Sequence, residues 1–454
     1  MIYVLCMTPP PSGSVFELYR KIVSFRVIKQ LAGKHGVQLR ARKYTLVLLF
    51  WLMIWQRLAT PGTLAQAVST VRQGQWGPLV GRRRGKKKSR PPQDVSSYTG
   101  GYCRARQRVP TEMMKQITGY LTAELQKQLG GTELRRAVYV IDGSSLQLQP
   151  EQELVEHYPP ARNQHGCSHW PVLRLVVLHD AHTGLALSPA WAPMSGTGAL
   201  SEQALAEQLM GQVPPEAVLL GDRNFGIFAT AFAATQRQRA VILRLTGVRA
   251  QCLGGHCLQA GTDREVVWCP SRWDRKHHPE LPAEASVRGR LLVCGAPGWR
   301  QLVCLFTTLD CPAQEILDLY RLRWNIETDL RSLKQTVRLH RLTSKSQPMI
   351  EKELWAAIAA YNLVRTVIAR AAHQASLDPR RLSFAQVLYL VNAFLPDLVS
   401  GSPQKAKREM KRLIELAATC KLPQRRRSRS YPRAVWRPGY RYPAKRQNMV
   451  NQSK

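Results

Sequence analysis

Two aspartates stand at positions where their carboxylates could bind a metal ion. Asp142 follows the apolar run 137–141 and precedes a glycine, and Asp222 follows the apolar run 217–220. If these carboxylates meet, they need a cation, because like charges disfavour joint ionisation. Carboxylate oxygens are the ligands that Mg²⁺ prefers. Each aspartate could instead only cap a turn or helix, but two matching contexts favour a metal site.

A third carboxylate comes from helical spacing. Residues 313–336 contain no Pro or Gly and predict one long helix. At about 100° per residue, four of its side chains fall within a sector of roughly 60°; these are Tyr320, Arg323, Glu327 and Lys334. We expect Glu327 to complete the metal site. The alternative is a solvent-exposed helix with an Arg323–Glu327 ion pair.

The elements around these residues predict an α/β fold. Residues 137–141, 172–178, 185–191 and 217–220 predict strands, with a turn at 180–184 and a helix at 200–210 before the last strand. This order is typical of ribonuclease H-like nucleases, in which the first and fourth strands lie side by side. The sequence thus predicts a ribonuclease H-like catalytic core, a mixed five-stranded sheet with helices.

Five parts of the chain differ in character. Residues 1–95 predict a helical N-terminal DNA-binding region with helices at 46–58 and 63–72 and a basic linker. The first part of the core would be 96–237. We expect a mainly β insertion domain at 238–311, with strands at 241–245, 265–268, 289–294 and 301–306. Residues 312–400 would carry the Glu-bearing helix and the rest of the core, and 401–454 a basic C-terminal arm.

The net positive charge of the chain indicates a nucleic-acid partner. The 454 residues carry a formal net charge of +36, and the segments 18–93 and 416–454 contain no acidic residue. Two acid-free ends favour a surface that tracks nucleic-acid phosphates over a merely solvated basic face. Tyr320, Arg323 and Lys334 would contact phosphates, and Trp324 could stack on a base. The same role is predicted for basic residues in the two ends, namely Arg82, Arg83, Arg84, Lys86, Lys87, Lys88, Arg425, Arg426 and Arg427.

Other classes of protein and site are disfavoured. No apolar run reaches the ~18–20 residues of a membrane span, and no signal peptide is visible. We therefore expect a cytoplasmic, nucleoid-associated protein without a membrane partner. The ten cysteines should be free thiols. Cys252, His256 and Cys257 lack the regular pairs of a zinc site.

The motifs together resemble the insertion-sequence-four family of bacterial DDE transposases. Tyr320, Arg323, Glu327 and Lys334 match its Y-x2-R-x3-E-x6-K signature. The segments 142–144 and 221–226 resemble its first and second aspartate motifs, and the similarity spans about 97–372. Ser144 and Asn224 stand where the family often has Thr and Gly. The family is also known for an insertion-domain aromatic that takes the place of a flipped base; Trp299 is a candidate, although its spacing favours a core or turn role.

The resemblance implies a mechanism and partners. Asp142, Asp222 and Glu327 would bind two Mg²⁺ ions, which Mn²⁺ could replace. One ion would activate the nucleophile and the other would stabilise the leaving 3′ oxygen. Water would free a 3′-OH at each transposon end, and that hydroxyl would later attack target DNA. The partners would be double-stranded DNA, as transposon ends and target, and a second copy of the chain in a homodimer.

Three rival functions also have to be weighed against the sequence. Another ribonuclease H-like DNA nuclease would share the two aspartates but has no reason to carry the Tyr-Arg-Glu-Lys signature. A catalytically inactive DNA-binding relative could keep the acidic residues. A basic RNA-binding or packaging protein explains the charge but none of the carboxylate contexts.

Overall fold

A computed structural model describes residues 19, 23–37, 43–79, 95–129, 136–163, 166–255, 258–295, 302–400 and 402–423. The chain divides by its contacts into Met1–Lys421 and Leu422–Lys454, and the elements below belong to the first unit. No helix in these described ranges is long and apolar enough to cross a membrane. The five-part domain division stays a prediction.

The N-terminal part is helical, with α2 at Phe25–Lys34, α3 at Leu46–Leu58 and α4 at Leu64–Arg72. The helices predicted at 46–58 and 63–72 are therefore confirmed. Thr45 caps α3, because its side chain accepts a hydrogen bond from the Leu48 backbone N–H. A helix that is apolar on all sides has to be buried, and α3 is buried along nearly its whole length.

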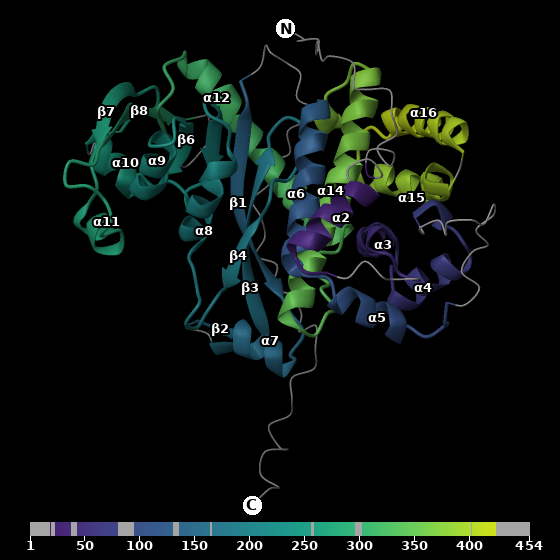
Figure 1. Ribbon diagram of the computed structural model, residues 1–454. Coiled ribbons are helices and arrows are strands. Elements are labelled where there is room, and N and C mark those ends of the chain that lie inside the picture. The colour runs from purple at the N-terminus through teal and green to yellow at the C-terminus, as the bar shows by residue number, and fades with distance from the viewer. Residues whose placement is uncertain are drawn as a thin grey trace, which may run out of the picture. The chain divides into compact units, whose positions relative to one another are not determined.

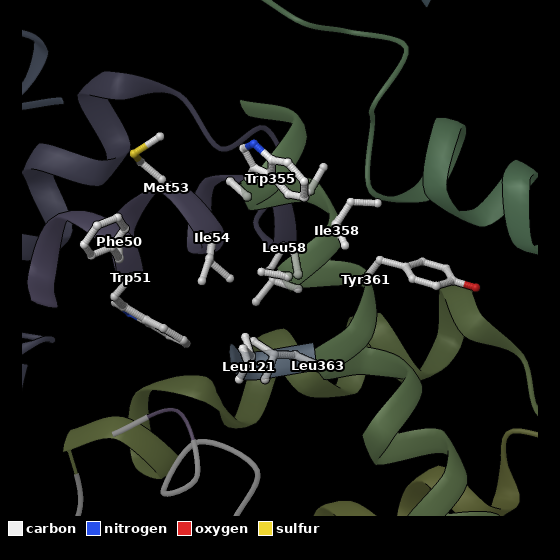
Figure 2. Packing of buried hydrophobic residues seen from close by; sticks show 14 of the residues in the cluster. Phe50, Trp51, Met53, Ile54, Leu58, Leu121, Trp355, Ile358, Tyr361 and Leu363 are labelled. Carbon is white, nitrogen blue, oxygen red and sulfur yellow. The ribbon is translucent and has the colours of Figure 1, made fainter. Parts of the chain in front are cut away.

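The partners of α3 come from far along the chain. It packs against α14, Gln347–Gln374, while α6, Thr111–Leu129, packs along α14 as well. Figure 2 shows Ile54 and Leu58 of α3 in one apolar cluster with Leu121, Ile358 and Leu363. Three more helices contribute to the same apolar cluster, namely α5 (Gly100–Gln107), α15 (Phe384–Ser400) and α16 (Pro403–Thr419).

A mixed sheet forms the other part of the fold (Figure 1). Its strands follow the order β2-β3-β1-β5-β6-β9-β8-β7, and β4 pairs with β3. Strand β1 is parallel to β5 and antiparallel to β3, while β5 and β6 are parallel. The strands are β1 (Val138–Gln147), β2 (Pro160–Asn163), β3 (Gly166–Asp180), β4 (Ala190–Pro193), β5 (Val218–Gly221), β6 (Ala240–Leu245), β7 (Asp263–Trp268), β8 (Val287–Cys294) and β9 (Val303–Thr307).

The sheet is larger than predicted. Within the described residues it has nine strands instead of five. The strands predicted for the insertion domain are present, but β9 pairs with β6 and carries β8 and β7 with it. The strands between the second aspartate and the Glu-bearing helix therefore continue the central sheet.

Two strand boundaries also differ from the predictions. The first strand does not end at Asp142, because residues 142–147 stay paired with residues 177–172 of β3. The strand predicted at 185–191 is mostly absent, since only an isolated bridge at Ala186 and the short β4 form there. The turn predicted at 180–184, directly after β3, is present. In it, Gly184 takes the left-handed backbone (φ +80°) that favours glycine.

Helices cover both faces of the sheet (Figure 1). Helices α8 (Glu202–Leu209) and α9 (Phe228–Thr235) pack with Tyr139 and Ile141 of β1 on one face. The next residues in alternation, Val138 and Val140, pack on the other face with α12 (Ala313–Arg321) and α13 (Asn325–Arg331). Three short helices complete the unit, α7 (Gln152–His157), α10 (Gly247–Gly254) and α11 (Arg272–His277).

Candidate active site

The two aspartates predicted from the sequence lie on neighbouring parallel strands. Residues 138–140 of β1 pair in register with residues 218–220 of β5. Two further steps along each chain reach Asp142 and Asp222. The adjacency that the sequence predicted for the first and fourth strands is therefore present.

Both carboxylates belong to the same face of the sheet. Side chains alternate between faces along a strand, so Asp142 shares a face with Val140, and Asp222 with Leu220. These two apolar residues lie in one buried cluster with Ile326 of α13. The fold thus places the Glu-bearing helical segment over the face that carries both aspartates.

The environment of Asp142 disfavours its negative charge. Burial raises the pKa of Asp142 to about 6; the carboxylates of Asp222 and Glu202 also raise it, while the backbone N–H of Gly143 and the Arg323 guanidinium lower it. The Gly143 N–H donates to Asp142 Oδ1 at 2.8 Å. The protein's own groups thus leave an ionised Asp142 only partly compensated, a setting that fits a bound cation.

A fourth carboxylate, Glu202, lies beside the two aspartates and was not singled out in the sequence. It is the first residue of α8, and its Oε2 accepts a hydrogen bond from Asn224 Nδ2. The backbone N–H of Asn224 in turn donates to Asp222 Oδ1 at 2.8 Å. A Cβ at position 143 would overlap the Glu202 carboxylate. Gly143 therefore leaves the space that the Glu202 carboxylate occupies, and that glycine was the one sequence signal available.

The segment 313–336 is not the single regular helix that was predicted. Helices α12 and α13 are separated by a 3₁₀ turn, Leu322–Trp324, and a π-helical turn follows at Ser332–Thr336. A 3₁₀ helix has 3.0 residues per turn and a π turn is wider than an α-helix. A constant 100° per residue therefore does not apply along the whole segment, and the predicted narrow sector of four side chains stays a prediction.

The signature residues divide between the interior and the surface. Tyr320 and Arg323 are each only 8% exposed, and the Tyr320 hydroxyl has no hydrogen-bond partner among the described residues. Trp324 is exposed, and the Arg323 guanidinium lies 4.7 Å from its ring centroid. Glu327 is also exposed, with Oε1 3.6 Å from Arg323 Nη2. The segment thus turns Trp324 and Glu327 outward and Tyr320 and Arg323 inward.

Lys334, the last signature residue, contacts the aspartate-bearing strand. Its Nζ donates to Ser144 Oγ at 2.9 Å and to the Ser145 carbonyl at 3.2 Å. Burial lowers the pKa of Lys334. A cation is thereby held two residues from Asp142.

The predicted metal ligands are only partly gathered. Among the residues that the structure describes, no three His, Cys, Asp or Glu side chains form a group that could hold a metal ion. Asp142 and Asp222 are adjacent, whereas Glu327 is paired with Arg323. The three-carboxylate metal site stays a prediction.

A buried ionic network fixes the helix that carries Glu327. Asp329, two residues further along α13, is fully buried and accepts hydrogen bonds from Arg365 of α14 and from Arg380. Burial alone would raise the pKa of Asp329, but the charges of these two guanidiniums outweigh the effect of burial and lower that pKa. His179 lies 3.8 Å away, yet burial lowers its pKa to about 4, so it is neutral at neutral pH and adds no ion pair.

Several predicted sites lie outside the described residues. These are the basic contacts in the two ends (Arg82, Arg83, Arg84, Lys86, Lys87, Lys88, Arg425, Arg426 and Arg427), Trp299, and His256 with Cys257. The cysteines whose side chains the structure describes are free thiols, as predicted.

The metal-free protein should gain stability when Asp142 is replaced by Asn. The pKa of Asp142 is about 6 in the folded state and 3.8 as its ordinary value. Its protonation therefore stabilises the fold at low pH, and this contribution is lost as pH rises through about 6. At pH 7.5 in EDTA, we expect Asp142→Asn to raise the free energy of unfolding by about 3 kcal/mol, at 1.36 kcal/mol per pKa unit.

Urea unfolding at pH 7.5 and pH 4 measures this difference, which should shrink at the lower pH. Asp310→Asn, at an exposed position, is the matched control and should shift neither midpoint. Equal unfolding midpoints for Asp142→Asn and the unchanged protein at pH 7.5 would contradict the prediction.

Comparison with known proteins identifies relatives of this chain. A family model described as "Transposase DDE domain" matches residues 133–363, about half of the chain. The transposase InsG for insertion sequence element IS4 of Escherichia coli (strain K12) is 30% identical over 285 residues, covering 60% of this chain and 62% of that protein. The chain therefore matches less than two thirds of the length of this curated relative.

A solved structure is also similar in part. The cryo-EM structure of a piggyBac transposase synaptic complex with hairpin DNA matches with a TM-score of 0.42 and 11% identity, over 90% of this chain and 86% of that one. A likeness at this level carries no conclusion about fold or function. The family match and the InsG relative, by contrast, confirm the resemblance drawn from the Tyr-Arg-Glu-Lys signature and the two aspartate motifs. The chain belongs to the transposase DDE domain family.

Proposed function

We propose that this protein excises and integrates a DNA insertion sequence by metal-dependent phosphodiester hydrolysis and strand transfer at terminal inverted repeats. The observation that carries the proposal is the pair Asp142 and Asp222, in register on parallel strands beneath the helical segment that bears Glu327. Membership of the transposase DDE domain family supports this reaction class.

The sheet supports a ribonuclease H-like core within the larger fold. In order across the sheet, β3 is antiparallel to β1, and β5 and β6 follow β1 in parallel. The aspartates end up at the centre of this arrangement, on β1 and directly after β5. This is the placement that the strand order in the sequence predicted.

Asp142, Asp222 and Glu327 are the residues proposed to hold two Mg²⁺ ions, with Mn²⁺ as a possible substitute. The raised pKa of Asp142 fits such ligands, because burial and the neighbouring carboxylates both disfavour its negative charge and a divalent cation would offset them. Bound divalent ions would supply activation of the attacking oxygen and stabilisation of the leaving 3′ oxygen. Glu202, hydrogen-bonded to Asn224, would hold the loop after β5 in place.

The basic residues around the carboxylates would position DNA. Lys334 is proposed to contact a phosphate from its place beside Ser144, and exposed Trp324 to stack on a base. Arg323 and Tyr320 would stabilise charge at the scissile phosphate from inside the site. For the basic residues of the two ends, the net charge of +36 supports contact with the DNA backbone.

The proposed partners follow from the reaction. They are double-stranded DNA, as transposon ends and as target, and a second copy of the chain, because two ends must be joined in one complex. The InsG relative is named for an insertion sequence element, which supports this choice of DNA. We place the protein in the bacterial cytoplasm with the nucleoid, where that DNA lies.

Strand transfer should separate this function from that of another ribonuclease H-like nuclease. A duplex that carries the DNA flanking this reading frame, pre-cut to expose its 3′-OH, is mixed with protein, Mg²⁺ and a supercoiled plasmid. We expect covalent joining of the duplex to the plasmid, measured on a gel with labelled duplex. A duplex ending in a 3′-dideoxynucleotide is the matched control and should not be joined.

A protein that cuts DNA but never joins the pre-cut end would be assigned to the rival nuclease class. One that binds DNA without either reaction would be an inactive relative.

A further inference from the structure

A cavity lined by arginines lies between the N-terminal helices and α14. It has a volume of about 240 Å³, far more than the ~10–15 Å³ that one water needs. Figure 2 shows Met53 of α3, which lines the cavity, and Trp355 of α14, the neighbour of the lining residue Ala356. We call this cavity the arginine pocket; its charged lining residues are Arg57, Arg106, Arg338, Arg341 and Glu353.

One of the four arginines is neutralised inside the protein. Arg57 Nη2 lies 2.6 Å from Glu353 Oε2, and both side chains are buried. Glu353 also accepts hydrogen bonds from the Thr343 backbone N–H and the Ser344 hydroxyl. The carboxylate is therefore occupied and cannot compensate the other arginines.

The other three guanidiniums have no carboxylate partner among the described residues. Arg338 donates to the carbonyls of Gln56, Ala59 and Pro61, which are neutral groups. Burial lowers the pKa of Arg338, and the neighbouring Arg57 and Arg341 lower it further. The acid-free segments 18–93 and 416–454 cannot supply a counter-charge either.

Two donors in the pocket are buried without a partner. The Nε atoms of Arg106 and Arg338 make no hydrogen bond within the part of the chain that the structure describes, and Arg106 is only 9% exposed. Buried charged donors are normally satisfied. Position 338 also has φ +60°, a backbone region that few residues other than glycine adopt and that is common at functional sites.

The pocket lies next to the candidate active site along the chain. The π-helical turn brings Lys334 to Ser144, beside Asp142, and only four residues later Arg338 reaches the pocket. Arg341 is exposed at the pocket, whereas Arg106 lies inside it. An anion that enters from solvent would therefore meet first Arg341 and then Arg106.

We propose that the arginine pocket binds one phosphate of the DNA backbone. A tetrahedral phosphate offers several acceptors to the planar forks of guanidinium groups, which is why arginines gather at phosphate sites. Its charge would compensate Arg106, Arg338 and Arg341 and give the unpartnered Nε donors an acceptor. The choice of DNA over free phosphate rests on the function proposed above.

The salt dependence of DNA binding tests the proposal. Binding of a labelled duplex by the full chain is measured in EDTA over a range of salt concentrations, so that cleavage plays no part. Each phosphate contact contributes about 0.9 to the slope of log K against log salt. We expect Arg341→Gln to lower that slope by about 0.9 and to weaken binding of different sequences equally. Arg106→Gln should do the same, and exposed Arg341 keeps the test valid if Arg106→Gln fails to fold.

Arg381→Gln is the matched control, since Arg381 is an exposed arginine that lies outside the pocket and outside both acid-free ends. An unchanged slope for Arg341→Gln overturns the proposal, and so does an equal fall for Arg381→Gln, which would reflect general charge only. Thermal unfolding with inorganic phosphate separates the two sources of phosphate. If phosphate stabilises the unchanged protein but not Arg341→Gln while the DNA slopes agree, the pocket binds free phosphate and the DNA assignment fails. Because no metal is present, failure of the proposed catalysis would leave these results untouched.

Discussion

Proteins carrying Asp222→Asn or Glu327→Gln are expected to bind DNA as the unchanged protein does and to cleave it at about a thousandth of its rate or less. Both changes remove a proposed metal ligand while keeping the size of the side chain. Loss of a single preorganised electrostatic group already costs about 10²–10³ in rate. Cleavage of a plasmid that carries the flanking DNA, with Mg²⁺, measures the effect.

The control for this comparison comes from the same helical segment. Glu315 lies in the first turn of α12 and is exposed, so Glu315→Gln removes one negative charge without touching the site. It should cleave at the normal rate. Glu327 deserves its own measurement because it is exposed and paired with Arg323 at 3.6 Å. Normal cleavage by Glu327→Gln would remove it from the catalytic residues and leave the two aspartates in place.

Asp329→Ala is expected to destabilise the fold by about 3–5 kcal/mol, the usual cost of leaving a buried charge without its partner. Here two guanidiniums, those of buried Arg365 and partly buried Arg380, would lose the same carboxylate. The folded-state pKa of Asp329 is lowered, so its contribution is present above the unfolded pKa and is lost as pH falls through the folded pKa. Urea unfolding at pH 7 and at progressively lower pH measures both effects.

Asp318→Ala gives the comparison for a surface pair. Asp318 also faces an arginine on the same helical segment, Arg321 at 2.5 Å, but both side chains are exposed. Such pairs contribute about 0–1 kcal/mol. If both alanine variants lost the same small amount of unfolding free energy, the buried network would not hold the Glu-bearing helix in place.

The sequence could predict the parts of the site that rest on local pattern. An apolar run followed by an aspartate appears twice, at Asp142 and Asp222, and the order of elements between them predicted neighbouring strands. That pairing is present in register. The Tyr-Arg-Glu-Lys spacing predicted the family, which the comparisons confirm.

What the sequence could not predict depends on contacts between distant residues. Glu202 stands in an ordinary helix start, and only the packing of α8 against Gly143 brings its carboxylate to the aspartates. The 3₁₀ and π turns leave no trace in apolar spacing. The contact between Lys334 and Ser144 joins residues that are 190 positions apart in the chain. The sequence around Asp329 does not distinguish it from other acidic residues on helices. Its ion pairs with Arg365 and Arg380 are visible only in the fold.

The packing of α3 against α14 sets an order of events during synthesis. Leu46–Leu58 leaves the ribosome about 300 residues before Gln347–Gln374, the helix that buries it. Contacts between such distant segments form slowly, and an apolar segment that waits for its partner can bind chaperones or aggregate. Glu327 and the network around Asp329 also arrive late. A nascent chain therefore carries both aspartates long before α13 and α14 are available to complete the candidate site.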